Sequence, residues 1–355
     1  MLDLKELNAQ IGPADEAARS ASQAHWDGIA KPLRGLGDLE TAVSRIAALT
    51  GSEDVRIDRR AVLVMCADNG VVAEGVTQSD PSVTATMAGN IRDHKSSVCL
   101  MAKSAGADVF AEDMGMLTRV EGVEGCHIAD GTGNIAVGPA MTKEQAIEAI
   151  AYGMELAKRC RDDGYQILVT GEMGIGNTTT SSAVTAVMLG MRVEEITGRG
   201  AGLSDTGLVK KIDAIMRALK VNGPDPEDPL DILAKVGGFD IAGMCGVFLG
   251  GALYGVPVII DGLISSVAAL IAARMCPNAK KAMLASHCSA EPAAEQILSE
   301  LELTPLIHAG LKLGEGTGAV CLLPLLDMAL SVYHNSVMFA DSGMEQYTIQ
   351  EGDKR

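Results

Sequence analysis

Six short apolar runs alternate with longer segments that repeat apolar residues at helical spacing. The runs are Ala61–Cys66, Ala107–Ala111, Gln166–Thr170, Pro257–Asp261, Ala282–Ser286 and Pro305–His308. The clearest helical segments are Lys143–Arg161, Thr206–Lys220 and Leu263–Met275. Strands that are apolar throughout and alternate with helices form parallel sheets covered on both faces. We therefore predict an α/β protein with an open, mostly parallel six-stranded sheet and helices on both faces.

The two ends of the chain differ from this alternating pattern. Residues 1–50 carry helical periodicity, which is interrupted at Lys31–Glu40, and the stretch Ser342–Arg355 is polar. We predict that residues 1–50 belong to a small helical domain, which helices from the C-terminal end complete. Residues 51–330 would form an α/β catalytic domain, and residues 331–355 a C-terminal helix and polar tail.

Charge and composition exclude several classes of partner. The net charge of −17 argues against nucleic acid or an anionic membrane surface, and 3% aromatic content argues against a stacking surface for single strands. The chain begins with charged residues and has no apolar run of transmembrane character, so neither a signal peptide nor a membrane anchor is expected. Eight scattered cysteines without Cys-x-x-Cys spacing indicate a reduced, cytoplasmic protein. No metal site is expected, because the pair His287-Cys288 consists of adjacent residues, which are poorly placed to bind one metal ion together.

One strand–loop–helix segment, Gln166–Leu189, predicts an anion site. Its apolar run enters the glycine-rich turn Gly171–Gly176, and small hydroxyl residues lead into a helix. Such a turn presents backbone N–H groups at a helix N-terminus, where an anion can bind. The turn lacks the Gly-Lys-[Ser/Thr] of a Walker A loop, and Thr179 breaks the Gly-x-Gly-x-x-Gly fingerprint. We interpret it as a site for one phosphate with the Glu172 carboxylate beside it; a tight turn without a ligand is the alternative.

Short clusters of glycine and polar or acidic residues follow nearly every predicted strand. In open α/β sheets the ligand binds beyond the carboxyl ends of the strands, so these clusters would meet at one site. Asp and Gly are also ordinary turn formers, and the prediction therefore depends on their repetition at one edge. The clusters are Asp68-Asn69-Gly70, Asp113-Met114-Gly115, Gly171-Glu172, Asp261-Gly262, Ser286–Glu291 and Gly314–Gly318.

The residue types at this predicted site limit its chemistry. The sequence has no Gly-x-Ser-x-Gly or Cys/His/Asn arrangement for a covalent nucleophile and no His-Glu-x-x-His metal pattern. Carboxylates, glycine loops and lysines suit transfer of a phosphorylated sugar, in which N–H groups hold the phosphate and a carboxylate removes a proton from the nucleophile. Val258–Gly262 resembles the motif that binds phosphoribosyl pyrophosphate, but it has one acid instead of two adjacent acids. A pyrophosphate donor with Mg²⁺ is therefore disfavoured.

Eight motifs between about Lys31 and Leu330 occur in the order of a known family. They are Lys31–Glu40, Ala67–Val76, Gly174–Thr179, Gly198–Gly202, Val236–Ala242, Ile260–Gly262, Ser286–Glu291 and Leu313–Ala319. The chain resembles the nicotinate-nucleotide–dimethylbenzimidazole phosphoribosyltransferase family. The resemblance implies a Rossmann-like fold, a homodimer and no cofactor. It also implies transfer of phosphoribose from nicotinate mononucleotide to a benzimidazole-type base, which gives an α-ribazole phosphate for the lower ligand of a cobamide.

The resemblance implies roles for particular residues. Glu315 matches the family's general base, and Glu172 matches a residue that faces substrate. Nicotinate leaves a pyridinium as a neutral ring, which requires no metal. Without the resemblance, Lys211 would be interpreted as a solvated helix lysine and Glu315 equally well as a surface carboxylate. Gly314 and Gly316 flank Glu315 and are implied to let substrate approach closely. The residues implied to hold the donor's phosphate and ribose, or to lie near the phosphate, are Gly174, Ile175, Gly176, Asn177, Thr178, Gly200, Ala201, Gly202, Leu203, Ser204, Lys211 and Ser289.

The chain departs from the family pattern where the acceptor base is expected. The implied acceptor pocket consists of Asp68, Asn69, Ser79, Asp80 and Ser82. Most relatives have Asp-His-Gly where this chain has Asp68-Asn69-Gly70, and many have an aromatic residue followed by Pro-Gln within the 79–82 segment. These departures leave open which base is accepted, and we expect a broad acceptor range.

Two other functions remain open on the sequence alone. The first is a non-catalytic nucleotide-binding or sensor module on the same fold, against which the retained Glu315 argues. The second is a transferase that uses phosphoribosyl pyrophosphate with Mg²⁺, against which the single acid after Ile260 argues. For the phosphate turn we expect that Gly176→Val lowers donor affinity and changes thermal stability little.

Overall fold

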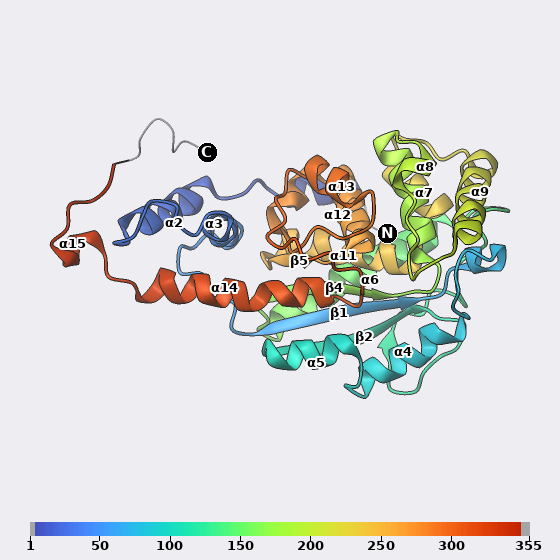
Figure 1. The fold of residues 1–355 in the computed structure, drawn as a ribbon, viewed down its shortest axis with the longest axis horizontal. Coiled ribbons are helices and arrows are strands. Elements are labelled where there is room, and N and C mark those ends of the chain that lie inside the picture. The colour runs from blue at the N-terminus through green and yellow to red at the C-terminus, as the bar shows by residue number, and fades with distance from the viewer. Residues whose placement is uncertain (1–3, 349–355) are drawn as a thin grey trace.

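The computed structural model describes residues 4–348, which are organised around one six-stranded sheet (Figure 1). The strands are β1 (Arg60–Ala67), β2 (Ala107–Gly115), β3 (Glu124–Gly125), β4 (Ile167–Met173), β5 (Val258–Ile260) and β6 (Met283–Ala285). All neighbouring pairs are parallel, and the order is β3-β2-β1-β4-β5-β6. The chain changes direction across the sheet between β1 and β4, which is where doubly wound sheets bind ligands. The predicted fold class is confirmed.

Helices cover both faces of this sheet. The α-helices are α1 (Leu4–Gln10), α2 (Glu16–Gly28), α3 (Asp38–Thr50), α4 (Ser82–Arg92), α5 (Ser97–Ser104), α6 (Lys143–Asp162), α7 (Asn177–Leu189), α8 (Val193–Ile196), α9 (Asp205–Asn222), α10 (Pro229–Val236), α11 (Phe239–Tyr254), α12 (Leu263–Met275), α13 (Ala294–Glu300), α14 (Thr317–Asn335) and α15 (Phe339–Ser342). Two 3₁₀ segments are η1 (Gly70–Glu74) and η2 (Pro277–Ala282). The start of α6 was predictable because Thr142 and Gln145 form a capping box.

One predicted strand is wrong, and one strand was missed. The run Pro305–His308 makes only a single bridge, between His287 and Ile307. The backbone N–H groups of Leu306 and Ile307 both donate to the Ser286 carbonyl, which ends the pairing after one step. The sixth strand is instead β3, whose two residues are exposed and carry no apolar pattern for a sequence to show.

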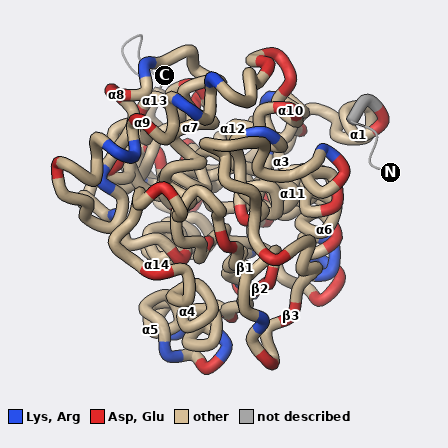
Figure 2. The backbone as a smooth tube through the Cα atoms, turned by 90° about the vertical axis from the view of Figure 1, so that its right-hand side faces the viewer, with Lys and Arg blue, Asp and Glu red and all other residues tan. Residues whose placement is uncertain are grey.

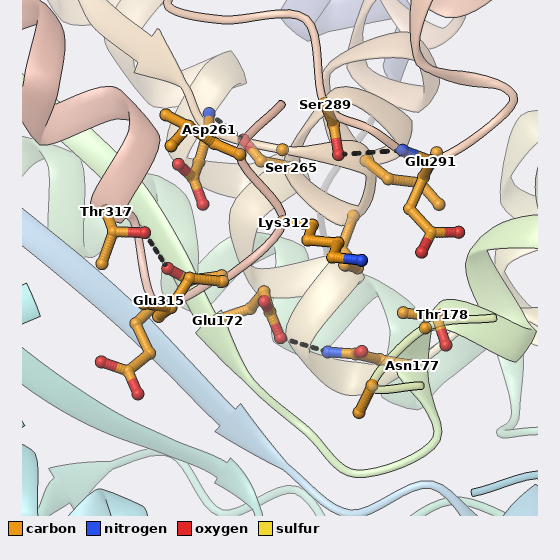
Figure 3. A pocket seen from close by; sticks show the side chains of 18 of the residues that line it. Glu172, Asn177, Thr178, Asp261, Ser265, Ser289, Glu291, Lys312, Glu315 and Thr317 are labelled. Carbon is orange, nitrogen blue, oxygen red and sulfur yellow. Dashed lines mark hydrogen bonds between the residues drawn. The ribbon is translucent and has the colours of Figure 1, made fainter. Parts of the chain in front are cut away.

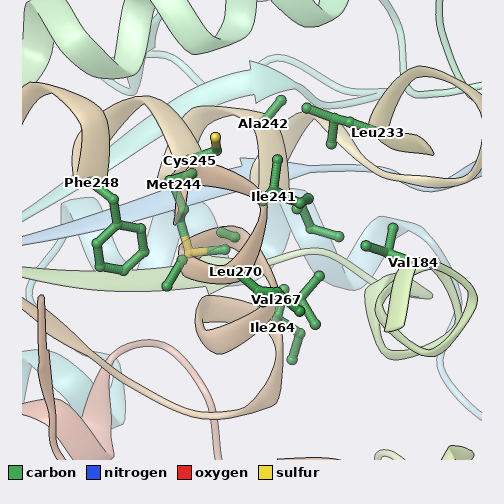
Figure 4. Close-up of a cluster of buried hydrophobic side chains, with 14 of the residues drawn as sticks. Val184, Leu233, Ile241, Ala242, Met244, Cys245, Phe248, Ile264, Val267 and Leu270 are labelled. Atoms are coloured by element: carbon green, nitrogen blue, oxygen red, sulfur yellow. The ribbon is translucent and has the colours of Figure 1, made fainter. Parts of the chain in front are cut away.

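Alternate side chains of β1 enter two separate cores. Leu63 and Met65 pack into the core beneath α6, α11 and α12, and Val62 and Val64 pack into the core on the side of α3, α5 and α14. The first core is aliphatic and sulfur-rich, and Figure 4 shows how α7, α10, α11 and α12 contribute to it. Because both faces are covered, the carboxyl edge of the sheet is left as the place where loops can form a site.

The N-terminal helices contact the C-terminal end of α14. Tyr333 on α14 packs edge-on against Trp26 of α2, with ring centroids 4.8 Å apart, and its hydroxyl donates to Ser22 Oγ at 3.2 Å. Ile29 and Met338 form an isolated bridge next to this contact. Figure 1 shows α2, α3, α15 and the end of α14 together at one end of the molecule. α14 is long and apolar enough to cross a membrane, but 56% of its most apolar window is buried in the fold, as in a core helix.

Candidate active site

A cavity lies at the carboxyl edge of the sheet, beside the switch between β1 and β4. Loops after β4, β5 and β6 line it together with the loop before α14. The N-termini of α7, α12 and α14 also border it, and helix N-termini attract anions. Figure 2 views the molecule from its right-hand side in Figure 1; acidic positions lie near the ends of β1 and β2, and most basic positions lie towards the rim.

The lining joins most of the motifs that the sequence analysis singled out. It consists of Glu172, Met173, Gly174, Ile175, Asn177, Thr178, Gly200, Ala201, Asp261, Gly262, Leu263, Ile264, Ser265, His287, Ser289, Glu291, Leu311, Lys312, Leu313, Gly314, Glu315 and Thr317. Residues from five separate segments, far apart in the sequence, therefore border one space (Figure 3).

Glu315 is held in a strained and specific conformation. Its φ is +61°, between Gly314 at +89° and Gly316 at +92°, and a non-glycine residue rarely occupies this region. The turn lies directly on β4, since a Cβ at Gly171 would approach the Glu315 carbonyl oxygen to 2.4 Å. The Val98 N–H, in the first turn of α5, donates to Glu315 Oε2 at 3.2 Å. Burial raises the pKa of Glu315, which suits a group that must accept a proton.

Asp261 fixes the turn that carries Glu315. The Ala319 N–H donates to Asp261 Oδ1 at 2.9 Å, and the Gly316 N–H donates to Oδ2 at 3.1 Å. These groups belong to the first turn of α14, so Asp261 caps that helix from the neighbouring loop. Burial raises the pKa of Asp261 to about 6, which leaves it ionised at neutral pH. We interpret Asp261 as a structural anchor of the site.

Lys211 lies behind the glycine-rich turn. Its Nζ donates to Thr178 Oγ1 at 2.8 Å and to the Gly198 carbonyl at 3.1 Å, and its side chain is fully buried. A Cβ at Gly200 would lie 3.5 Å from Nζ, so only a glycine separates Lys211 from the cavity at that point. Burial lowers the pKa of Lys211 to about 8. The sequence-only interpretation of Lys211 as a solvated lysine is wrong.

The cavity also contains residues to which the sequence analysis gave no role. His287 lies so close to α14 that a Cβ at Gly318 would be 2.1 Å from its ring. Burial lowers the pKa of His287, which favours the neutral imidazole. Lys312 and Thr317 come from the loop and helix around Glu315. The sequence of the Leu311–Gly314 loop gave no indication that Lys312 lines a cavity, because a lysine in a loop ordinarily faces solvent.

Several predicted site residues lie outside the lining. Gly176, Gly202, Leu203, Ser204 and Gly316 flank lining residues without being part of it. Asp68 and Asn69 are buried below the turn: the Leu117 N–H donates to Asp68 Oδ2 at 2.8 Å, and a Cβ at Gly176 would lie 3.3 Å from Asn69 Cβ. The role of these residues in substrate binding stays a prediction.

The predicted acceptor segment also lies outside the lining. Ser79, Asp80 and Ser82 are at the start of α4, partly or fully exposed. The segment is tied to the 200–204 loop, because the Gln78 side-chain amide donates to the Gly202 carbonyl. Within residues 4–348, no group of three or more His, Cys, Asp or Glu residues is placed to hold a metal ion.

We expect Gly176→Val to weaken donor binding and also to destabilise the protein. Gly176 has φ +96°, and a Cβ there would lie 2.9 Å from Val72 Cγ2. A left-handed conformation costs a non-glycine residue about 1–2 kcal/mol. We therefore expect a lower thermal stability, in place of the nearly unchanged stability expected from the sequence. Gly190→Val, with φ +61° and open space around its Cβ, is the control for this strain at the other end of α7. Both variants should have a lower melting temperature by calorimetry, but only Gly176→Val should lose affinity for nicotinate mononucleotide. If both variants bind it with equal affinity, the phosphate does not bind at this turn.

The chain is similar in sequence and in fold to known phosphoribosyltransferases. A family model described as a phosphoribosyltransferase matches residues 11–344. A nicotinate-nucleotide–dimethylbenzimidazole phosphoribosyltransferase from Acetivibrio thermocellus is 43% identical over 342 residues, covering 96% of this chain and 97% of the relative. One from Escherichia coli is 41% identical, covering 97% of both chains. The crystal structure of the protein of this name from Thermus thermophilus matches with TM-score 0.87 at 36% identity, covering 94% of this chain and all of that one. The chain belongs to the nicotinate-nucleotide–dimethylbenzimidazole phosphoribosyltransferase family.

Proposed function

We propose that this enzyme transfers phosphoribose from nicotinate mononucleotide to a ring nitrogen of a benzimidazole-type base. The bond between C1′ of the ribose and the pyridinium nitrogen breaks, and its electron pair neutralises the leaving nicotinate. The base nitrogen forms a new bond to C1′, and its proton passes to Glu315. The products are an α-ribazole phosphate, which serves the lower ligand of a cobamide, and nicotinate.

The observation that carries this proposal is that one cavity has the buried Glu315 carboxylate at one end and hydroxyl and glycine residues, backed by a lysine, at the other. The Glu315 carboxylate extends towards the N-terminus of α5, away from Asn177 and Lys312 (Figure 3). Thr178, Gly200 and Ser289, with Lys211 behind them, lie in the other part of the lining. A donor phosphate bound there would leave C1′ between the two ends, with the acceptor base on the side of α4 and α5. A sensor module has no need of a base in this position.

The test is a transfer assay without added metal. Purified enzyme is incubated with nicotinate mononucleotide and benzimidazole in the presence of a chelator, and nicotinate release is followed by chromatography. We expect nicotinate and a ribazole phosphate in equal amounts. Binding of the mononucleotide without turnover would favour a sensor module, and turnover only with phosphoribosyl pyrophosphate and Mg²⁺ would favour the other transferase class.

We expect a broad acceptor range. The 79–82 segment at the start of α4 is polar and short, and it lacks an aromatic side chain that could select one base by stacking. Losing one such contact changes discrimination by about 1–3 kcal/mol, roughly 10–200-fold. Competition assays with paired bases should therefore show comparable use of dimethylbenzimidazole and unsubstituted benzimidazole. A preference of a hundredfold or more for the dimethyl form would show that other residues of the acceptor pocket select this base.

The family also supports proposals about the assembly and its location. We propose a cytoplasmic homodimer in which α2, α3 and the end of α14 form a small helical domain. The contacts of Tyr333 with Trp26 and Ser22 support the domain, and all eight cysteines are unpaired, as suits a reducing compartment. Light scattering should give twice the mass of one chain; the mass of a single chain at micromolar concentration would contradict the dimer.

A further inference from the structure

Glu172 in the cavity is linked to a second acid in the core. The side-chain nitrogen of Asn177 donates one hydrogen to Glu172 Oε2 and the other to Asp240 Oδ2, the latter at 2.9 Å. Figure 3 shows the contact between Glu172 and Asn177. Asp240 comes from the first turn of α11, is fully buried and does not line the cavity. A single amide therefore bridges an acid that can meet substrate and an acid that cannot.

The three neighbouring acids differ in the donors that surround them. Asp261 accepts from two backbone N–H groups at the start of α14. Asp240 accepts from Asn177 and from the Ile241 N–H at 3.0 Å. Within residues 4–348, the Glu172 carboxyl accepts only from Asn177. Because a buried carboxylate needs donors to carry its charge, Glu172 is the acid of the three that is least suited to be ionised.

The titratable groups that face Glu172 add to this effect. They are Asp240 from α11, Asp261 after β5, Glu315 before α14 and Cys66 on β1, and Asp68 faces Asp240 in turn. None of these groups is a cation. Lys312 lines the cavity, but it is exposed and forms no ion pair within residues 4–348. Burial and then the charge of Asp240 raise the pKa of Glu172 to about 8, whereas burial raises the pKa of Asp240 only to about 6.

We propose that Asp240, whose charge faces Glu172 across the shared Asn177 amide, is a positioning residue that keeps Glu172 protonated, so that the cavity offers a neutral carboxyl O–H to the anionic donor. The identity of that donor rests on the proposed function. Nicotinate mononucleotide carries a phosphate and a ring carboxylate, and an ionised Glu172 would repel both. A protonated Glu172 instead donates a hydrogen bond to a donor oxygen. Asn177 occupies Oε2 of Glu172, and Oε1 lies beside Gly314 of the lining, 2.7 Å from where a Cβ on that glycine would be, next to the turn that carries Glu315.

The first test measures the proton without substrate. In protein with ¹³C-labelled glutamate, the Glu172 carboxyl resonance is identified by its loss in Glu172→Gln and then followed against pH. We expect a midpoint near pH 8 in the wild type. Asp240→Asn removes the charge but keeps an oxygen for Asn177, and it should lower the midpoint by on the order of one pH unit. Asp341→Asn, an exposed aspartate in the first turn of α15, should leave it unchanged.

Two results would overturn the inference. One is a wild-type Glu172 that titrates below pH 6, and this result is decisive even if Asp240→Asn does not fold. The other is an Asp240→Asn variant with an unchanged Glu172 midpoint and a lower melting temperature, because Asp240 would then serve only the packing of α11. The titration needs no substrate, so its failure is distinguishable from failure of the transfer assay.

The second test links the proton to donor binding. If the Glu172 midpoint moves from about pH 8 to about pH 7, the protonated fraction at pH 7.5 falls about threefold. The affinity of Asp240→Asn for nicotinate mononucleotide should fall by the same factor at pH 7.5 and match the wild type at pH 5.5. Because glutamine stays neutral, the affinity of Glu172→Gln relative to the wild type should show no such threefold loss between pH 5.5 and pH 7.5. An equal loss for Asp240→Asn at both pH values would contradict the role of the proton.

Discussion

Replacing Glu315 with Gln should reduce turnover by roughly 10²–10⁴-fold, the usual contribution of a general base. Glutamine keeps the size of the side chain and its contact with the Val98 N–H, but it cannot take the proton of the acceptor nitrogen. The KM for nicotinate mononucleotide should change little, because the donor phosphate is proposed to bind at the other end of the cavity. Single-turnover kinetics with saturating base would measure the loss directly.

The matched control is Glu302→Gln. Glu302 also has a left-handed backbone, with φ +58°, but it is exposed and lies outside the cavity. It should retain wild-type turnover. If Glu315→Gln stays within a few-fold of the wild type, the proton leaves by another route and Glu315 is not the base.

Replacing Lys211 with Met should weaken binding of nicotinate mononucleotide by roughly 10–150-fold, the equivalent of a lost hydrogen bond to a charged group. The apo protein should be equally stable or more stable, because burial of the ammonium disfavours its charged form. Lys210→Met, which changes the exposed neighbour on the same helix, should bind as the wild type does. Calorimetry gives both the affinity and the stability.

The same variant has a predicted pH signature. The pKa of Lys211 is lowered to about 8 in the free enzyme, and a bound phosphate dianion raises it again by stabilising the ammonium. Well below pH 8 the lysine is charged both before and after binding, so it takes up no proton. Above pH 8 binding takes up a proton, and affinity falls as pH rises. At pH 8.5 Lys211→Met should take up about 0.8 proton fewer than the wild type; an equal uptake would place the phosphate away from Lys211.

Much of the scaffold was predictable because its signals are local. Apolar runs bounded by glycine or acids defined five strands, and the periodic segment Leu263–Met275 was predicted as the helix that is observed. The positions of the site loops followed from parallel topology, since clusters after successive strands must meet at one edge. β3 could not be predicted from its own two residues. Its pairing with β2 depends on how the fold brings this segment back beside β2.

The sequence by itself determined the fold class, the edge at which the loops meet and the family motifs that name Glu315 and the glycine-rich turn. Tertiary structure alone decided the charge state of the site residues and which groups they contact. Lys211 has the pattern of a surface helix residue, and only the packing of α9 against α7 buries it. Asp240 and Glu172 lie 68 positions apart, and only the fold places one amide between them. The reason is physical: burial and neighbouring charge set whether an acid or a lysine is ionised, and both depend on which elements pack together.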